Sequence, residues 1–313
     1  MSEPLRFGCQ FQAFRGREDF LDTARRLEAV GFDVLTFPDH FGGWAGMWPA
    51  IVAAASVTTT LRLGPMTVNN ELWNPIVLAR DAVSADVLSD GRLELGLGAG
   101  WRQADSTIAG IVPRAPGERI ERLAESVEIL RSYFSPGAFE YDGMFHRASV
   151  PAQRILPAQP HLPIFIGGGG RRIVRLAAAA ADIIGVHINL GSSQFAIGRG
   201  STDVAQGVEL DAMERRLAWI ARDRPANLAR PELHLFVLEV RRGPSSLEAA
   251  ATIAPNFGIT SADVVASPWF LTGPVEAMAE KIVAVQARYG ISYFTVVEEH
   301  ADTMVEVMKL LRR

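Results

Sequence analysis

The run Leu162-Pro163-Ile164-Phe165-Ile166-Gly167-Gly168-Gly169-Gly170-Arg171-Arg172 decides the fold of this chain. It is typical of a buried strand that ends in four glycines and leads into a helix, predicted over 173–181, with a second strand over 182–187. Glycines leave backbone N–H groups uncovered, and the start of a helix gathers several of them, which suits an anion. The sequence therefore predicts a strand–turn–helix unit whose turn binds a phosphate group.

The same unit recurs along the chain. In four segments an amphipathic helix stops at a glycine or alanine and a short apolar strand follows, as in a parallel sheet built from β-α units. Other apolar runs complete a set of eight candidate strands, with helices between nearly all of them. The helix–strand segments are 24–37, 77–97, 173–186 and 277–297, and the remaining strands are predicted at 5–10, 61–68, 164–167 and 233–240.

Eight such units in 313 residues favour an α/β fold closed into a (β/α)8 TIM barrel, with insertions in the loops that follow the strands. The first strand-to-helix turn lacks the glycine fingerprint of a dinucleotide-binding sheet, and an open sheet with an insertion is the alternative. Segments 137–160, 191–207 and 243–274 interrupt the alternation, so we expect irregular structure there and lids over the barrel mouth at the last two. We expect one domain over residues 1–313.

Composition narrows the range of partners. Lys and Arg number 31 against 35 Asp and Glu, so the formal charge of −4 gives no field that attracts nucleic acid or an anionic membrane. The single cysteine, Cys9, excludes an internal disulfide framework and fits a reducing compartment. The first residues do not resemble a leader, and no apolar run is long enough to span a membrane. We therefore expect a cytoplasmic protein with a small-molecule substrate.

Polar and aromatic residues follow the predicted strands, at the end where barrel enzymes place their chemistry. Asp39 and His40 come after the second strand. An imidazole exchanges protons near neutral pH, and a neighbouring carboxylate fixes a cofactor ring or the tautomer of the imidazole. The alternative is that Asp39 caps the loop and His40 only fills space. Trp44, Trp73 and Trp101 follow three different strands, and we expect them to form flat apolar walls for an aromatic ring.

The remaining sequence signals concern alternative explanations of the glycine run, metal ligands and hydrolase motifs. Glycines also permit close helix-to-strand packing, but four in succession, followed by Arg171 and Arg172, favour phosphate binding. His187 and His300 have no partner at the spacing of metal ligands, so no metal site is expected. The chain has neither a P-loop nor the nucleophile elbow of α/β-hydrolases.

Four longer motifs occur in a fixed order: GFDVLTFPDHF at 31–41, RLGPMTVNN at 62–70 with NPIVLA at 74–79, LSDGRLELGLGAGW at 88–101, and IFIGGGG at 164–170. With these motifs the chain resembles the bacterial luciferase-like family of flavin- and deazaflavin-dependent oxidoreductases over nearly its whole length. The fold of that family is a (β/α)8 barrel, which agrees with the prediction above.

The resemblance implies the deazaflavin coenzyme F420, with hydride transfer to or from a small organic substrate and His40 giving or taking the proton. It implies a non-prolyl cis peptide within 65–69, beside the ring. Some deazaflavin members have a glutamate where this chain has Trp101, which leaves Glu71 or Glu298 as substitute acids. The implied catalytic residues are His40, Asp39 and Trp44, and the implied cofactor-binding residues are Asp39, Met66, Thr67, Val68, Asn69, Gly98, Gly100, Trp101, Gly167, Gly168, Gly169, Gly170 and Arg171.

Two alternatives keep the barrel. One is an FMN-dependent luciferase-like monooxygenase, because a flavin passes single electrons to oxygen whereas a deazaflavin carries hydride only. The other is a noncatalytic flavin- or deazaflavin-binding protein. The Asp39-His40 pair and the 98–101 turn resemble the deazaflavin branch more closely. Members of the family often pair, so a homodimer is expected.

Overall fold

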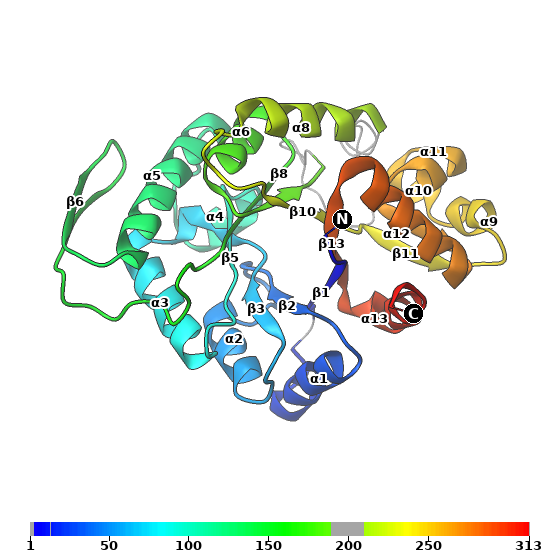
Figure 1. Ribbon diagram of the computed structural model, residues 1–313, viewed down its shortest axis with the longest axis horizontal. Coiled ribbons are helices and arrows are strands. Elements are labelled where there is room, and N and C mark those ends of the chain that lie inside the picture. Colours follow the sequence, from blue (N-terminus) through cyan, green and yellow to red (C-terminus); the bar gives the residue numbers. More distant parts are fainter. Residues whose placement is uncertain (1–2, 13, 189–209, 313) are drawn as a thin grey trace.

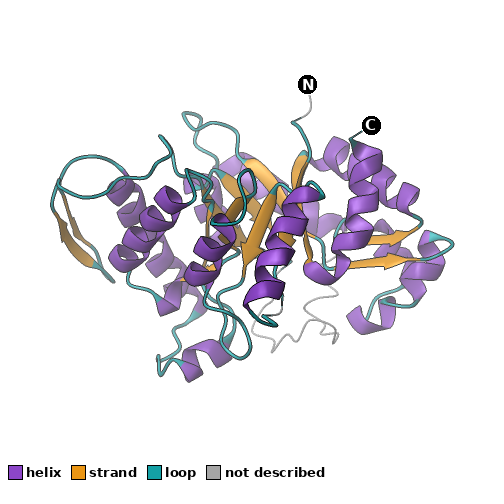
Figure 2. Cartoon of the chain, turned by 90° about the horizontal axis from the view of Figure 1, so that it is seen from below, coloured by secondary structure: helices purple, strands orange, loops and turns teal. Residues whose placement is uncertain are grey.

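Parallel strands at the centre of the molecule close into a barrel (Figures 1 and 2). The structure is a computed structural model that describes residues 3–12, 14–188 and 210–312. Each strand hydrogen-bonds to its neighbours in parallel, in the order β3-β2-β1-β13-β10-β9-β8-β5-β4. The strands are β1 (Arg6–Gln10), β2 (Val34–Phe37), β3 (Arg62–Pro65), β4 (Val68–Asn69), β5 (Leu95–Gly98), β8 (Ile164–Gly168), β9 (Ile183–Val186), β10 (Glu232–Phe236) and β13 (Ile291–Val297).

The two ends of this strand order meet, which excludes the open sheet. The third predicted strand, 61–68, is divided into β3 and β4 by a non-prolyl cis peptide between Met66 and Thr67. Leu63 of β3 donates its N–H to Arg92 O at 3.0 Å and accepts from Glu94 N at 2.9 Å, while Val68 of β4 pairs with Leu97 of β5. The third and fourth barrel strands are thus joined along their length.

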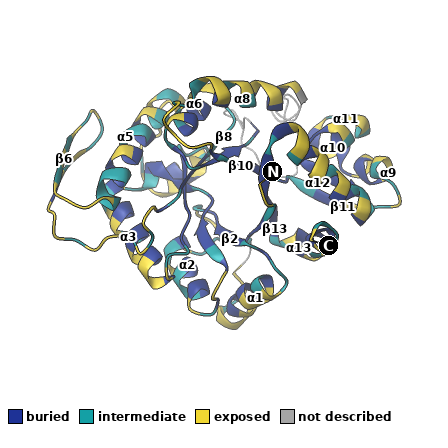
Figure 3. Ribbon diagram, viewed as in Figure 1, coloured by how far each residue is buried: buried dark blue, intermediate teal, exposed yellow. Residues whose placement is uncertain are grey.

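Helices surround the strands, with buried faces inward and exposed faces outward (Figure 3). Helix α6 shows the cause: Ile173, Val174 and Ala177 lie on one face and are buried, while Arg171 and Arg172 are exposed. The outer layer consists of α1 (Arg17–Ala29), α2 (Met47–Ala55), α3 (Pro75–Leu88), α5 (Pro116–Phe134), α6 (Arg171–Ala180), α8 (Leu210–Asp223), α12 (Val275–Tyr289) and α13 (Ala301–Leu311), with the short helices η1 (Asn70–Leu72), α4 (Gln103–Ile108) and η2 (Glu298–His300) in loops.

The insertions are more regular than the sequence suggested. Segment 137–160 contains an antiparallel hairpin, β6 (Phe139–Asp142) and β7 (Arg147–Val150), which projects at the edge of the molecule (Figure 2). The prediction of irregular structure at 243–274 was wrong, because it contains α9 (Ser246–Ala251), α10 (Ala254–Phe257), α11 (Ser261–Ala266) and β12 (Phe270–Gly273). The predicted strand 233–240 is two strands: β10 lies in the barrel, and β11 (Glu239–Arg242) pairs with β12 in a separate sheet. The predicted lid at 191–207 lies outside the described residues.

The barrel is filled by side chains from the strands and their ends. Val34, Met66, Phe165, Ile183 and Tyr293 form one buried cluster, separate from the larger core between strands and helices. A network of charged side chains lies below it, at the amino-terminal ends of the strands. There Glu94 accepts from Arg6 and from Arg62, and Glu232 also accepts from Arg6. The carboxyl-terminal end is therefore the end left for a ligand.

Candidate functional site

The structure brings the predicted site segments to one end of the barrel. Asp39 and His40 follow β2, Asn69 ends β4, Gly98 ends β5, and the glycine run 167–170 ends β8. All of these strands are parallel, so their carboxyl ends share one rim. Gly167 to Gly170 are partly exposed there rather than sealed in the interior. The loops needed for a ligand site are therefore adjacent in space although they are distant in sequence.

His40 is held by a carboxylate that the sequence did not reveal. Its Nδ1 lies 2.7 Å from Oδ2 of Asp105, which is completely buried. The other oxygen of Asp105 accepts the backbone N–H of Phe41 at 3.1 Å and the guanidinium of Arg102 at 3.2 Å. A carboxylate at this position makes Nδ1 the donor, which leaves Nε2 as the acceptor of the neutral ring. Asp105 lies on α4, beyond β5, and its place in a loop at the barrel mouth was the only sequence signal for it.

Asp39 has a different task from the carboxylate that orients His40. Its Oδ2 accepts the backbone N–H of Asn69 at 2.9 Å and the indole N–H of Trp73 at 2.8 Å. Burial raises the pKa of Asp39, and these two hydrogen bonds oppose the rise. Asp39 therefore fixes the loop after β2 against the loop after β4, while Asp105 fixes the tautomer of His40.

Two of the three predicted tryptophan walls meet at His40. The ring centroids of His40 and Trp101 are 5.7 Å apart and those of His40 and Trp44 are 6.3 Å apart, both with edge-to-face geometry. Trp73 is not part of this group, because its ring lies against Trp48 with centroids 6.4 Å apart and its N–H binds Asp39. Trp44 and Trp101 thus form the aromatic surroundings of the imidazole, and Trp73 supports the loop behind them.

The cis peptide between Met66 and Thr67 lies within the predicted range 65–69. The side-chain amide of Gln10 donates to the carbonyl of Met66 at 2.9 Å, which fixes the orientation of this turn. A Cβ at Gly98 would overlap the hydroxyl of Thr67, so the turn after β5 packs directly on this segment. Val68 and Asn69 continue it as β4, and both are buried. Backbone groups around Met66 and Thr67 therefore form one wall of the mouth.

Both substitute acids are engaged in ion pairs. Glu71 is buried and pairs with Arg114 at 2.9 Å and with Arg122 at 3.3 Å. Glu298 pairs with Arg15 at 3.0 Å and accepts the N–H of Gln12 at 3.4 Å. Both carboxylates serve ion pairs that hold loops, whereas the imidazole of His40 is held by the single carboxylate of Asp105.

The glycine run leads into a helix without a capping side chain. Helix α6 begins at Arg171 after Gly170, and within residues 3–12, 14–188 and 210–312 no side-chain cap hydrogen bond is found at its start. Arg171 is exposed beside them, whereas Arg172 pairs with Glu121 at 3.0 Å and Arg216 donates to the carbonyl of Gly169 at 3.0 Å. Uncapped N–H groups at the start of a ten-residue helix suit an anion.

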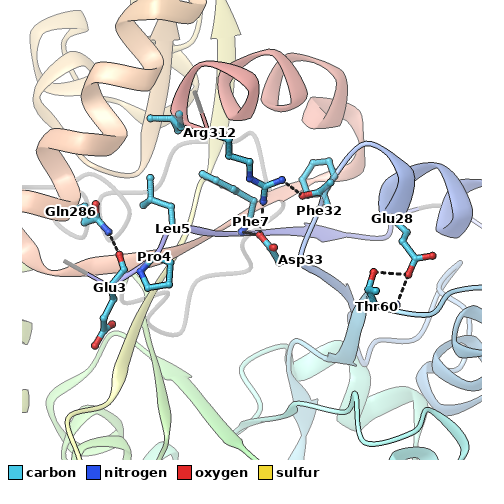
Figure 4. A pocket seen from close by; sticks show the side chains of 12 residues that line it. Glu3, Pro4, Leu5, Phe7, Glu28, Phe32, Asp33, Thr60, Gln286 and Arg312 are labelled. Carbon is cyan, nitrogen blue, oxygen red and sulfur yellow. Dashed lines mark hydrogen bonds and ion pairs between the residues drawn. The ribbon is translucent and has the colours of Figure 1, made fainter. Parts of the chain in front are cut away.

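A cavity of about 670 Å³ lies at the other end of the barrel and contains none of the predicted site residues. It is lined by residues that precede β1 and β2, among them Glu3, Leu5 and Asp33, and by Arg312 near the carboxyl terminus (Figure 4).

In the described part of the chain, no group of three or more His, Cys, Asp or Glu residues could hold a metal ion. In the same part, none of the helices combines the length and the apolar composition needed to cross a bilayer.

Comparison with known proteins gives consistent matches. A model of the family described as luciferase-like monooxygenase matches residues 7–201. An F420-dependent glucose-6-phosphate dehydrogenase of Segniliparus rotundus is 23% identical over 312 residues, which cover 90% of this chain and 89% of that protein. The coenzyme F420-dependent tetrahydromethanopterin reductase of Methanopyrus kandleri has a TM-score of 0.75 at 15% identity, with 97% of each chain covered. The FMN complex of the oxygenating constituent of 3,6-diketocamphane monooxygenase from Pseudomonas putida has a TM-score of 0.72 at 18% identity, covering 98% of this chain and 97% of that one.

Proposed function

This chain belongs to the luciferase-like monooxygenase family of oxidoreductases, and we propose that it transfers a hydride between the deazaflavin F420 and a small organic substrate. The choice of F420 is supported by the Asp39-His40 pair, by the turn at 98–101 and by the F420-dependent relative from Segniliparus rotundus. FMN is the alternative cofactor, because barrels of the same fold bind it.

The residues at the mouth fit such a cofactor. The uncapped N–H groups at the start of α6 and the exposed Arg171 would hold its phosphate. The backbone around Met66 and Thr67 and the indole of Trp101 would face its ring. When bound, the deazaflavin supplies a carbon centre that gives or accepts a hydride but does not activate oxygen.

The 2.7 Å contact between His40 and Asp105 is the observation on which the proposed mechanism rests. Asp105 holds the proton on Nδ1 of His40, so Nε2 takes a proton from the substrate hydroxyl in the oxidising direction and returns it in the reducing direction. The buried carboxylate also stabilises the imidazolium that forms. Trp44 and Trp101 surround the ring and limit access of water to it.

Separate titrations of the purified protein with F420 and with FMN, followed by tryptophan fluorescence, test the cofactor. We expect saturable quenching at lower concentrations of F420 than of FMN, because Trp44, Trp73 and Trp101 lie at or beside the mouth. Tighter FMN binding, with oxygen consumption when a flavin reductase is coupled, would instead identify a monooxygenase.

Turnover distinguishes an enzyme from a binding protein. Oxidised F420 bound to the protein should lose its visible absorbance when a panel of small alcohols is added, provided that one of them is a substrate. Binding of F420 without bleaching by any alcohol, and without recovery of absorbance when reduced F420 meets the matching ketones or aldehydes, would favour the noncatalytic alternative.

A further inference from the structure

A second histidine lies in the barrel mouth, on the side opposite His40. His187 directly follows β9, and the strand order places β9 four positions away from β2 around a barrel of eight. The two imidazoles therefore enter the same opening from opposite walls, one after the second barrel strand and the other after the sixth. The glycine run ends β8, and β8 pairs with β9, so a ligand that reaches from His40 to the glycine run ends next to the strand that leads to His187.

The ring of His187 occupies the floor of the mouth rather than its rim. It lies against Phe165, His234 and Phe236, with ring centroids 5.7 to 6.4 Å apart. Nε2 lies so close to Gly167 and Gly185 that a Cβ on either residue would come within 2.7 Å and 2.6 Å of it. The two glycines therefore make the space in which this ring lies.

His187 has unused hydrogen-bonding capacity. In the described part of the chain, neither of its ring nitrogens makes a hydrogen bond, and the residue remains partly exposed. His234, directly beneath it, differs because it is completely buried and places Nε2 2.9 Å from the hydroxyl of Thr295. A polar atom without a hydrogen bond at the floor of a ligand site contributes to the free energy of binding when a ligand group forms a hydrogen bond with it.

His187 is also electrically neutral near pH 7. Burial, together with the positive charge of Arg216, lowers its pKa to about 4. A neutral imidazole offers one donor and one acceptor and gives no advantage to an anion. Its environment thus contrasts with that of the α6 amino terminus and Arg171, which suit the phosphate.

We propose that His187 hydrogen-bonds an uncharged polar group, a ring carbonyl or a ring N–H, of the planar ring system bound in the mouth. This proposal rests on the proposed function, because it assumes a deazaflavin or flavin ring. Two parts of the mouth then bind two parts of the cofactor: the start of α6 binds the anionic tail at the rim, and His187 binds the ring at the floor.

Equilibrium binding of two probes tests the proposal: F420 and 5-deazariboflavin, which has a ring of the same type without a phosphate. His187→Phe keeps the packing against Phe165 and His234 but removes both nitrogens, so we expect the Kd of both probes to rise by a similar factor, about 3- to 10-fold. His187→Gln, which retains a polar end, should recover part of the loss. Arg171→Ala should weaken binding of F420 alone.

His161→Phe is the matched control, because His161 lies at the other end of the barrel, before β8, and pairs with Asp182. Its Kd values should equal those of the wild type, and the thermal midpoints of the His187 variants should lie within a few degrees of it. Unchanged Kd values in His187→Phe would overturn the proposal, as would weakening confined to F420. A wild-type protein that binds FMN but neither deazaflavin would overturn the choice of F420 instead, and the same variants would then be tested with FMN and riboflavin.

Discussion

The imidazole of His40 has one defined tautomer because a buried carboxylate holds one of its two nitrogens. A neutral amide at position 105 would no longer require the proton to stay on Nδ1, and it would not stabilise the imidazolium. The orientation of the ring would also loosen, because Asp105 accepts from Phe41 and Arg102 as well. The functional effect of position 105 is therefore exerted through His40.

Two substitutions separate these contributions. His40→Ala should lower kcat by about 10²- to 10⁴-fold, the usual contribution of general acid–base catalysis, and change the Kd of F420 little. Asp105→Asn should also lower kcat, by at least about 10-fold, and should change its pH dependence because the tautomer is no longer fixed. Steady-state turnover from pH 5 to 9 and fluorescence titration measure both effects. If His40→Ala kept full turnover, its assigned role would be wrong.

The residues found by sequence reasoning are those that lie next to a strand. Asp39 and His40 follow β2 directly, so their place at the rim could be read from the chain. Asp105 was missed because it lies on a six-residue helix inside a loop, and nothing in its neighbourhood marks it as the partner of a residue 65 positions away. Which carboxylate reaches which imidazole depends on loop geometry that local patterns do not contain.

At the scale of elements, the seam between β3 and β5 leaves no room for a side chain at Gly64. A Cβ there would overlap the carbonyl of Glu94, which belongs to the backbone and cannot turn aside. Gly64→Ala should lower the free energy of unfolding by about 2–3 kcal/mol, since the seam must open to admit the methyl group. Gly46→Ala is the control, because a Cβ at Gly46 makes only an ordinary 3.7 Å contact with Pro49. Urea denaturation of both variants measures the difference, and equal midpoints would contradict this account of barrel closure.

Lys281 connects α12 to the last turn of α11. Its ammonium group donates to the carbonyl of Val265 at 2.8 Å, and burial lowers its pKa to about 7. Between pH 7 and 10 the unfolded chain holds a proton that the folded chain has released, so the contribution of Lys281 to the free energy of unfolding rises with pH. In Lys281→Met this rise should be absent.

Urea denaturation at pH 7, 8, 9 and 10 tests this expectation. The difference in stability between wild type and Lys281→Met should shift in favour of the wild type as the pH increases. Lys309→Met, at an exposed position on α13, serves as the control and should follow the wild-type curve. Parallel curves for wild type and Lys281→Met would show that the proton is not lost in this range.

The alternation of helices and strands could be predicted from the sequence because each strand is short, apolar and bounded by glycine or polar residues. The segment 243–274 could not, since its three helices have four to six residues each, too short to show a helical period. Its one strong local signal was Thr260 followed by Asp263, which forms a capping box at the start of α11. The division of 233–240 depends on β12, whose residues pair with those of β11 from 31 positions further along the chain, and it has no local signature.

At the scale of the whole molecule, one end of the barrel is suited to stability and the other to chemistry. Glu94 at the amino-terminal end binds Arg6 of β1 and Arg62 of β3, both at 2.5 Å, and Arg6 also binds Glu232 of β10. Glu94→Gln should lower the free energy of unfolding by about 2–3 kcal/mol, because the arginines lose the charge that compensates their partial burial. Turnover below the unfolding transition should stay at the wild-type level.

Chemical denaturation and steady-state kinetics on the same preparation check this separation of roles. Glu18→Gln, which removes one partner of an exposed ion pair with Arg17, should change stability by less than about 1 kcal/mol and is the control. A loss of turnover in Glu94→Gln at a temperature where the protein remains folded would show that the two ends of the barrel are coupled.

The contact between His40 and Asp105 joins two separate segments, one after β2 and the other after β5. Grafting the 99–115 segment from a relative would therefore exchange the carboxylate that holds the histidine together with the rest of this loop. Such a chimera is expected to be inactive unless the donor segment brings its own carboxylate to the same atom.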